Sequence, residues 1–126
     1  MTAKESLIRR QTLANGLNLE FHDVSRPMAG DRWQVILEVR LPVPVATASL
    51  PPDLVDRAPE VLNALGPEIV FSQQDVRHFI DVRKVPAILE AMQALFLEGL
   101  GAYVSRPDFP GRFIRRKFIE DQGRQR

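Results

Sequence analysis

The chain of 126 residues contains no cysteine, only two histidines, one tryptophan and one tyrosine. The lack of cysteine excludes disulfide bonds, thiolate nucleophiles and zinc sites built on thiolates. A zinc or iron site would have to use both His22 and His78, completed by carboxylates such as Asp23 or Asp81. So small a ligand set predicts two ordinary strand histidines, no metal and no cofactor.

A long hydrophobic run is missing as well. Residues 1–6 carry charge and lack the apolar stretch of a secretory signal peptide. The most apolar part, residues 87–100, is interrupted by Glu90, Gln93 and Glu98 and is too short for a bilayer, which takes about 20 residues. Together with the lack of cysteine, these features predict a soluble, cytoplasmic protein without a transmembrane segment.

The overall composition is close to the globular average, with 44% hydrophobic and 26% charged residues. The length fits one domain, so we expect residues 1–126 to form a single domain whose tail frays from about residue 122. The net charge of +1 hides an asymmetry, because residues 106–126 hold seven basic and three acidic side chains. The other residues hold ten basic and thirteen acidic side chains, so a basic end follows an acidic body.

The clearest structural pattern is an alternation of apolar and polar residues over positions 32–43. Because successive side chains of a strand point to opposite faces, this alternation predicts a long strand with one buried face. The apolar side comprises Trp33, Val35, Leu37, Val39, Leu41 and Val43. The opposite side is polar except for Ile36 and Pro42.

Two more strands are predicted on either side of Asn15-Gly16, a dipeptide that favours tight hairpin turns. A two-residue turn would place Arg10 opposite Phe21 and point its side chain toward the core. Either this strand lies at an edge, where an inward charge discourages aggregation, or the register is different. Residues 25–31 have the composition of a turn-rich loop, and residues 69–80 have the extended character of a fourth strand.

Two helices are indicated by apolar residues that recur every three to four positions. The first pattern covers residues 53–65, and Pro59 within it indicates that the regular helix begins near Asp56, a candidate cap, and stops at Gly66-Pro67. The second covers residues 85–103, with Asp81 as a candidate cap and with Leu89, Met92, Leu95 and Phe96 among its repeating apolar residues. Glycines at positions 99 and 101 lack the spacing of a phosphate loop, so they predict close packing or a kink in this second helix.

Strands followed by helices, without β-α-β alternation, favour an α+β fold. We predict an antiparallel four-stranded meander sheet with one face covered by C-terminal helices. The helix over residues 85–103 would cover the apolar face of the strand over residues 32–43.

A shorter helix is predicted over residues 109–120, with Asp108 as a candidate cap. Its basic side chains are Arg112, Arg115, Arg116 and Lys117, and its apolar residues Phe113, Ile114 and Phe118 share another face. They could bind an acidic protein, an anionic membrane or a phosphate backbone, or they are the solvated face of a helix docked through its phenylalanines. One short cluster in a near-neutral chain falls short of a nucleic-acid footprint, so nucleic acid is not favoured.

A second candidate set consists of Arg77, His78 and Asp81, which resemble pieces of an acid–base or phosphate site. A Ser/His/Asp site would also need a nucleophile, and Ser72 and Ser105 lack the surrounding sequence of one. The structural alternative is that Arg77 faces solvent on its strand while Asp81 caps the following helix. No complete catalytic set is present in the sequence, and we do not expect an enzyme.

Three segments together resemble a family of small uncharacterised bacterial proteins: residues 32–43, the Phe79-Ile80-Asp81 step into a helix, and Arg106-Pro107-Asp108-Phe109-Pro110 before the basic helix. The resemblance covers nearly the whole chain and implies a shared fold, without implying a mechanism. We expect a non-enzymatic binding or regulatory module that acts on a protein or other anionic partner through a sheet edge, its loops or the basic helix. The alternative is a small enzyme or a nucleotide- or phosphate-binding protein using Arg77, His78 and nearby carboxylates.

Overall fold

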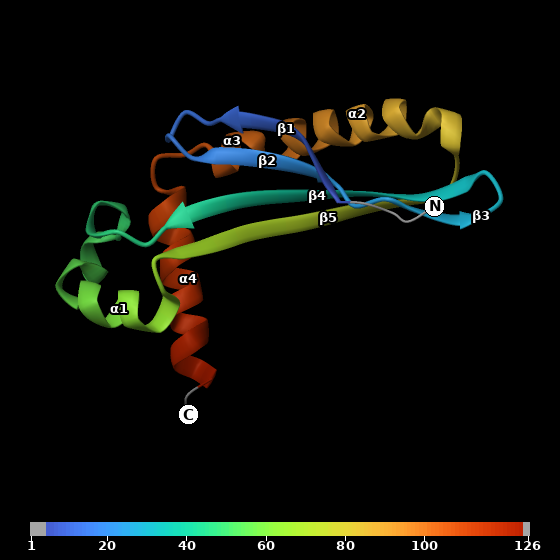
Figure 1. The fold of residues 1–126 in the computed structure, drawn as a ribbon. Helices are drawn as coiled ribbons and strands as arrows, with labels where there is room; N and C mark the ends of the chain where they lie inside the picture. The colour runs from blue at the N-terminus through green and yellow to red at the C-terminus, as the bar shows by residue number, and fades with distance from the viewer. Residues whose placement is uncertain (1–4, 125–126) are drawn as a thin grey trace.

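The structure, a computed structural model, describes residues 5–124. An antiparallel sheet carries a long helix along one face and a helical arm at one end (Figure 1). The strands are β1 (Ser6–Thr12), β2 (Asn18–Asp23), β3 (Arg26–Ala29), β4 (Arg32–Pro44) and β5 (Glu68–Asp81). The helices are α1 (Ala58–Leu65), α2 (Val85–Phe96), α3 (Ala102–Val104) and α4 (Phe109–Arg124). The predicted α+β fold with an antiparallel sheet is thus confirmed.

β4 is the central strand of the sheet. β2 and β3 pair in succession with one of its edges, and β5 pairs with the other. The ladder continues between β2 and β3, because Ile36 accepts a hydrogen bond from the Val24 N–H (3.0 Å) and donates one to the Ser25 hydroxyl (2.9 Å). The prediction of a loop over residues 25–31 was therefore wrong in part. This segment contains β3, so the sheet has five strands instead of the predicted four.

The hairpin between β1 and β2 settles the register that the sequence left open. Arg9, not Arg10, lies opposite Phe21. The Leu13 N–H donates to the Leu17 carbonyl (2.8 Å), so the loop is one residue longer than a two-residue turn. The extra residue rotates Arg10 to the outer face of the sheet, where the sequence had placed it on the inner one.

The turn residue Asn15 also makes a long-range contact. Its Nδ2 donates to the carbonyl oxygens of Val104 (2.8 Å) and Arg106 (2.9 Å), where the long helical segment ends. Its Oδ1 accepts a hydrogen bond from the Leu17 N–H (3.2 Å). The side chain therefore ties the hairpin to the helical layer, a role that the Asn-Gly turn pattern does not reveal.

The ends of the helices agree only partly with the predicted caps. α1 follows the 3₁₀ segment η2 (Pro52–Arg57), and its N-cap is Arg57 without a side-chain hydrogen bond, so the prediction of Asp56 as the cap was wrong. Gly66 ends α1 with φ of 79°, as predicted. The Asp81 carboxylate accepts a hydrogen bond from the Arg83 N–H (2.9 Å) and so caps the 3₁₀ turn η3 (Val82–Lys84) that leads into α2.

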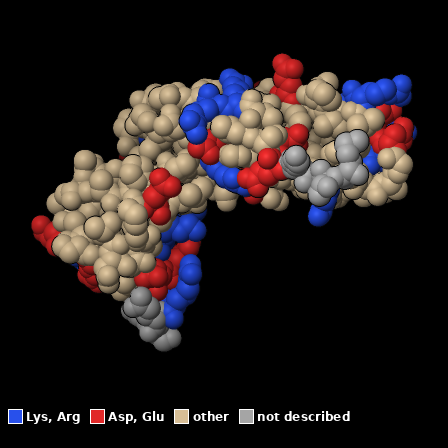
Figure 2. Space-filling view, viewed as in Figure 1, with Lys and Arg blue, Asp and Glu red and all other residues tan. Residues whose placement is uncertain are grey.

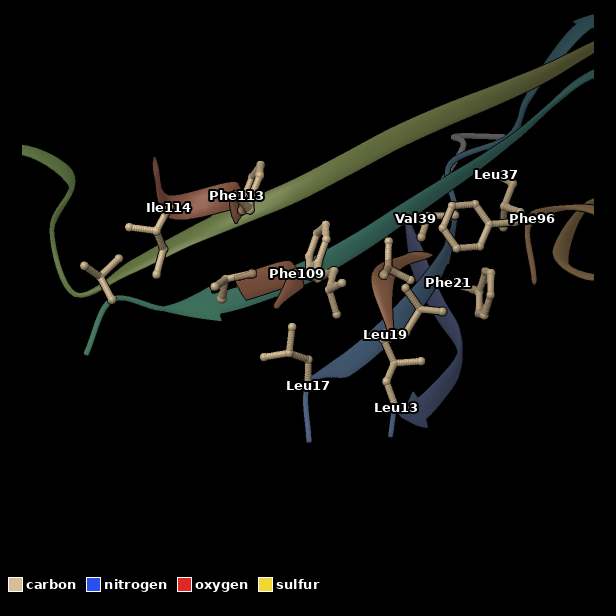
Figure 3. Close-up of a cluster of buried hydrophobic side chains, with 14 of the residues drawn as sticks. Leu13, Leu17, Leu19, Phe21, Leu37, Val39, Phe96, Phe109, Phe113 and Ile114 are labelled. Atoms are coloured by element: carbon tan, nitrogen blue, oxygen red, sulfur yellow. The ribbon is translucent and has the colours of Figure 1, made fainter. Parts of the chain in front are cut away.

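The core lies between the sheet and α2, as predicted (Figures 1 and 3). On the side of β4 that faces α2, the fully or nearly buried side chains are Val35, Leu37, Val39, Leu41 and Val43, and Trp33 at its start is half-buried. α2 places Leu89, Met92 and Phe96 against them. The ring of Phe96 meets that of Phe21 edge to face at 5.9 Å, so α2 is held over β2 and β4.

The helical arm at the end of the sheet, formed by α1 and α4, is held to β5 by aromatic packing. Phe109 is the first residue of α4. Its ring centroid lies 5.6 Å from that of Phe71 in β5 and 5.5 Å from that of Tyr103, both in edge-to-face geometry. The ring also stacks on that of Phe113, with the centroids 5.8 Å apart. α4 then runs away from the sheet beside α1 (Figure 1). The helix reaches Arg124, past the predicted end at residue 120, and residues 125–126 of the expected tail lie outside the described residues.

The helical segment after β5 is longer than its sequence pattern suggested. It continues from α2 through a π-helical turn, η4 (Leu97–Gly101), into α3. The run Val82–Val104 has 23 residues and contains an 18-residue stretch with a mean hydropathy of 1.3, so by length and composition it could cross a membrane. One such helix is weak evidence, because a core helix of a soluble protein meets the same test.

β5 carries an irregularity near its end. Trp33 pairs with Ile80 and Val35 pairs with Arg77, so two residues of β5 oppose one residue of β4. One of these two is Phe79, which has φ of 56° and a side chain that is 67% exposed. A bulky residue in the left-handed region is strained, and the bulge marks the end of the regular part of β5.

Candidate functional site

Two of the basic side chains singled out on α4 form ion pairs with aspartates. Arg112 Nε lies 2.9 Å from Asp108 Oδ2, and Arg115 contacts Asp53 at the start of η2. The hydrogen bond from Arg115 holds the pKa of Asp53 below its usual value. These pairs connect the start of α4 to the segments around it.

The other two basic side chains share one carboxylate. Arg116 Nε lies 3.8 Å and Lys117 Nζ 3.6 Å from Glu120, one turn further along α4. Both also lie over the ring of Phe113. Figure 2 shows acidic and basic side chains adjoining on the arm, so the basic residues of α4 are largely compensated locally.

A pocket of about 430 Å³ lies beside the start of α4. Arg112 and Arg115 border it, and its walls include Pro51, Pro52, Pro107 and Pro110. A Cβ atom on Gly111 would lie 3.4 Å from the carbonyl oxygen of Ser49, at the limit of ordinary van der Waals contact, so α4 packs closely against this loop. The proline-rich walls give the pocket a stiff backbone.

The alternative set around Arg77 does not come together. Arg77 lies opposite Val35 on the helix-covered side of the sheet and contacts Asp75 (2.6 Å). His78 is the next residue on the strand and faces the other side, where its Nδ1 lies 3.2 Å from Gln34. Arg77 and His78 therefore have no shared face on which to act together.

The two histidines lie on the outer face of the sheet, but each lies beside a different residue of β4. His22 is paired with Glu38 of β4, whereas His78 contacts Gln34, roughly 13 Å away along the strand. His22 Nε2 lies 2.9 Å from Glu20, and this hydrogen bond lowers the pKa of the Glu20 carboxyl. Within residues 5–124, no group of three or more His, Asp or Glu side chains could hold a metal ion.

The polar side of β4 contributes to a network that ties neighbouring strands together. Glu38 accepts a hydrogen bond from Gln74 of β5 (2.9 Å) and contacts Arg40 on its own strand. The Gln74 bond, followed by Arg40, lowers the pKa of Glu38. These contacts give the predicted polar face a structural role.

The long side of β5 that faces away from β4 forms a free edge. Among the described residues, β5 pairs with β4 alone. From Glu68 to Arg77 its pairing is regular, without a bulge. The opposite edge strand, β1, is shorter and has a register shift between Leu7 and Arg9. β5 is therefore the longer regular edge for strand addition.

Two hydrogen bonds at β4 show which residues of β5 bond to β4 and which direct their N–H and C=O groups to the free edge. We call this alternation the hydrogen-bonding phase of β5. The Val45 N–H donates to the Pro67 carbonyl (2.8 Å) on the β5 side, and the Val24 N–H donates to the Ile36 carbonyl (3.0 Å) on the other side. Bonded and non-bonded pairs alternate in an antiparallel ladder, so odd-numbered residues of β4 bond to β5. Their partners in β5 are also odd-numbered. The N–H and C=O groups at the free edge are those of Glu68, Val70, Ser72, Gln74 and Val76, and the Val76 carbonyl accepts a hydrogen bond from the Arg77 side chain (3.1 Å).

A groove of about 190 Å³ runs beside this edge on the helix-covered face. Its floor and its helical wall are mostly apolar, and include Leu37, Val39, Met92, Leu95, Phe96 and Leu100. Gln73 and Asp75 of β5 form the side next to the free edge. Leu95 is 55% exposed here, although its spacing in α2 predicted a core position, because α2 packs over β2 and β4 and leaves β5 partly uncovered.

A sheet edge was only one of several surfaces considered from the sequence, but the sequence of β5 does contain a feature that indicates an edge strand. Gln73, Gln74 and Asp75 are consecutive polar residues in the middle of a strand. A strand that is polar on both faces does not fit a central position, and such a strand is typical of a sheet edge. The groove had no signal, because it depends on where α2 crosses the sheet.

Comparisons with protein-family models, with curated proteins and with solved structures find no match to this chain.

Proposed function

We propose that this protein is a non-enzymatic binding module that accepts an extended polypeptide segment along the free edge of β5. The observation that carries the proposal is the regular run Glu68–Arg77, whose outward N–H and C=O groups have no strand partner within residues 5–124. Main-chain hydrogen bonds to such an edge provide affinity in strand addition.

The groove beside the edge supplies a basis for selectivity. In an added strand, alternate side chains point to the helix-covered face, next to Gln73 and Asp75. There they reach apolar side chains such as Leu95 and Leu100. A segment with an apolar residue at this position would bury surface in the groove, whereas a charged one would lose hydration without a partner.

A second candidate is the basic surface of α4, formed by Arg112, Arg115, Arg116 and Lys117, acting on an anionic partner. The pocket of about 430 Å³ bordered by two of these arginines favours it. The ion pairs to Asp53, Asp108 and Glu120 oppose it, because a ligand would have to replace contacts that already exist.

One experiment distinguishes the two surfaces. The Ser72→Pro variant removes an outward N–H and adds a ring at the free edge, while the ladder to β4 stays intact. We expect it to lose, by at least tenfold, the binding of a partner captured from the native host by the unaltered protein. The measurement is affinity purification followed by titration of the captured partner.

Two controls complete this test. Ser72→Ala keeps the N–H and should keep the partner. A variant with glutamine at all four basic positions of α4 should also keep it, since the edge is untouched. If binding survives Ser72→Pro and is lost in the glutamine variant, the edge proposal is wrong and the α4 surface is the binding site.

A further inference from the structure

We infer that the segment added to β5 is β5 of a second copy of this chain, paired antiparallel with Gln73 opposite Gln73. This inference rests on the proposed function and names its partner. It describes a two-fold symmetric dimer in which two sheets join into one across the free edges.

The hydrogen-bonding phase limits the registers that such a pair can adopt. Only even-numbered residues from Glu68 to Val76 direct their N–H and C=O groups outward. Both strands must therefore oppose even-numbered residues to even-numbered ones in order to form bonded pairs. The two-fold axis then passes between the two copies of one residue, so that this residue lies opposite itself.

Among these registers, the one centred on Gln73 is the most complementary. It places Val70 opposite Val76, so two apolar side chains meet on the outer face, and Val70 is 44% exposed in the single chain. It also places Ser72 opposite Gln74, which can form hydrogen bonds. Because of the two-fold axis, each of these pairs occurs twice.

The bulge in β5 limits the paired segment. In the same register Glu68 lies opposite His78, the first residue of the bulge in β5. The bulge formed by His78 and Phe79 ends regular pairing at this point. The regular paired segment of each copy is therefore Val70–Val76.

Neighbouring registers are poorer. Centring the pair on Asp75 would oppose two carboxylates of like charge directly. Centring it on Ser72 would set Val70 against Gln74, and centring it on Gln74 would set Val70 against His78. Each of these three registers removes the Val70–Val76 pair, so the register centred on Gln73 is preferred to them.

The groove fits the same arrangement. A two-fold axis perpendicular to the joined sheet keeps both copies of α2 on one face. Gln73 lines the groove, so the two grooves adjoin at the axis, and the exposed Leu95 of each copy borders the shared space. The contact uses the same surface on both chains and closes on itself, leaving the shorter β1 strands at the outer edges.

The first test is the mass of the full chain by sedimentation over a range of concentrations. We expect twice the monomer mass at high concentration, and a single monomer mass for Ser72→Pro under the same conditions. A monomer at every concentration up to the millimolar range would overturn the inference.

The second test fixes the register, and the chain is suited to it because it has no cysteine of its own. Residues opposite each other in a non-hydrogen-bonded pair have Cα atoms about 4.5 Å apart, within the roughly 4.4–6.8 Å that a disulfide spans. With diamide as the oxidant, Gln73→Cys should therefore give a covalent dimer. The matched control is Gln74→Cys, whose Cα atoms would lie roughly 8 Å apart, too far for a disulfide.

The outcomes separate this inference from the proposed function. Cross-linking of Gln73→Cys together with a dimer mass supports the inference. Cross-linking through position 74 instead, or through neither position, overturns it. If the chain is monomeric but Ser72→Pro still abolishes capture of another protein, the inference fails and the proposed function stands.

Discussion

Replacement of Phe109 with alanine is expected to lower the free energy of unfolding by about 3–5 kcal/mol. Phe109 is 2% exposed, and its ring contacts three other aromatic rings, those of Phe71, Tyr103 and Phe113. Removing the ring loses its burial and leaves a cavity between α4, β5 and the end of the long helix. Since domains are stable by about 5–15 kcal/mol, this loss is a large part of the total.

The measurement for Phe109→Ala is urea unfolding followed by circular dichroism, with thermal unfolding in parallel. Ile119→Ala on the same helix is the matched control, because Ile119 is 61% exposed and its truncation should change stability by about 0.5 kcal/mol or less. A loss below about 1 kcal/mol for Phe109→Ala would show that the aromatic cluster does not hold the arm to the sheet.

The second large effect is expected from proline at two adjacent positions of β5. Gln73→Pro removes an N–H that bonds to β4 and leaves a carbonyl of the central strand without its donor, at a cost of about 3 kcal/mol. Ser72→Pro removes an N–H that faces the free edge and should cost about 1 kcal/mol or less. The contrast between neighbours is a direct consequence of the alternating ladder.

Comparison of the two proline variants by urea unfolding tests whether Gln73 bonds to β4 and Ser72 faces the free edge. Gln73→Ala is the control for loss of the side chain, and it should cost well under 1 kcal/mol because Gln73 is exposed. If Ser72→Pro proves the more damaging variant, the outward and inward positions are reversed. In that case both the free-edge assignment and the register of the inferred dimer are wrong.

The strongest patterns in the sequence predicted the fold best. The alternation over residues 32–43 identified β4 and its buried face, because a period of two has one structural meaning. The spacing over residues 85–103 identified the covering helix, and Gly66 identified the end of α1. Each of these signals is local and depends on the chain alone.

The errors arose where distant contacts decide the outcome. β3 has a loop-like composition, and it becomes a strand because its backbone bonds to β4 beyond the interruption at Ser25. Loop length in the first hairpin shifted the register by one residue, which a dipeptide pattern does not determine. Leu95 was assigned to the core by periodicity, yet the position of α2 over the sheet leaves it beside the groove.

For the candidate site too, the sequence predicted the local features and missed those that depend on distant contacts. Sequence spacing correctly placed Phe113, Ile114 and Phe118 on the buried face of α4. The carboxylates that compensate its basic face come partly from a distant segment, as Asp53 does, so no local pattern could reveal them. The hydrogen-bonding phase of β5 likewise follows from its pairing with β4 and from nothing in its own sequence.

Residue-resolved amide hydrogen exchange along β5 tests most directly whether its free edge is a binding surface. In the dilute monomer we expect an alternation, with fast exchange at Val70, Ser72, Gln74 and Val76 and slow exchange at Phe71, Gln73 and Asp75. The fast amides should become protected when a strand is added, and therefore as the protein concentration is raised. Even-numbered amides that exchange as slowly as the odd-numbered ones in the dilute monomer would contradict the account.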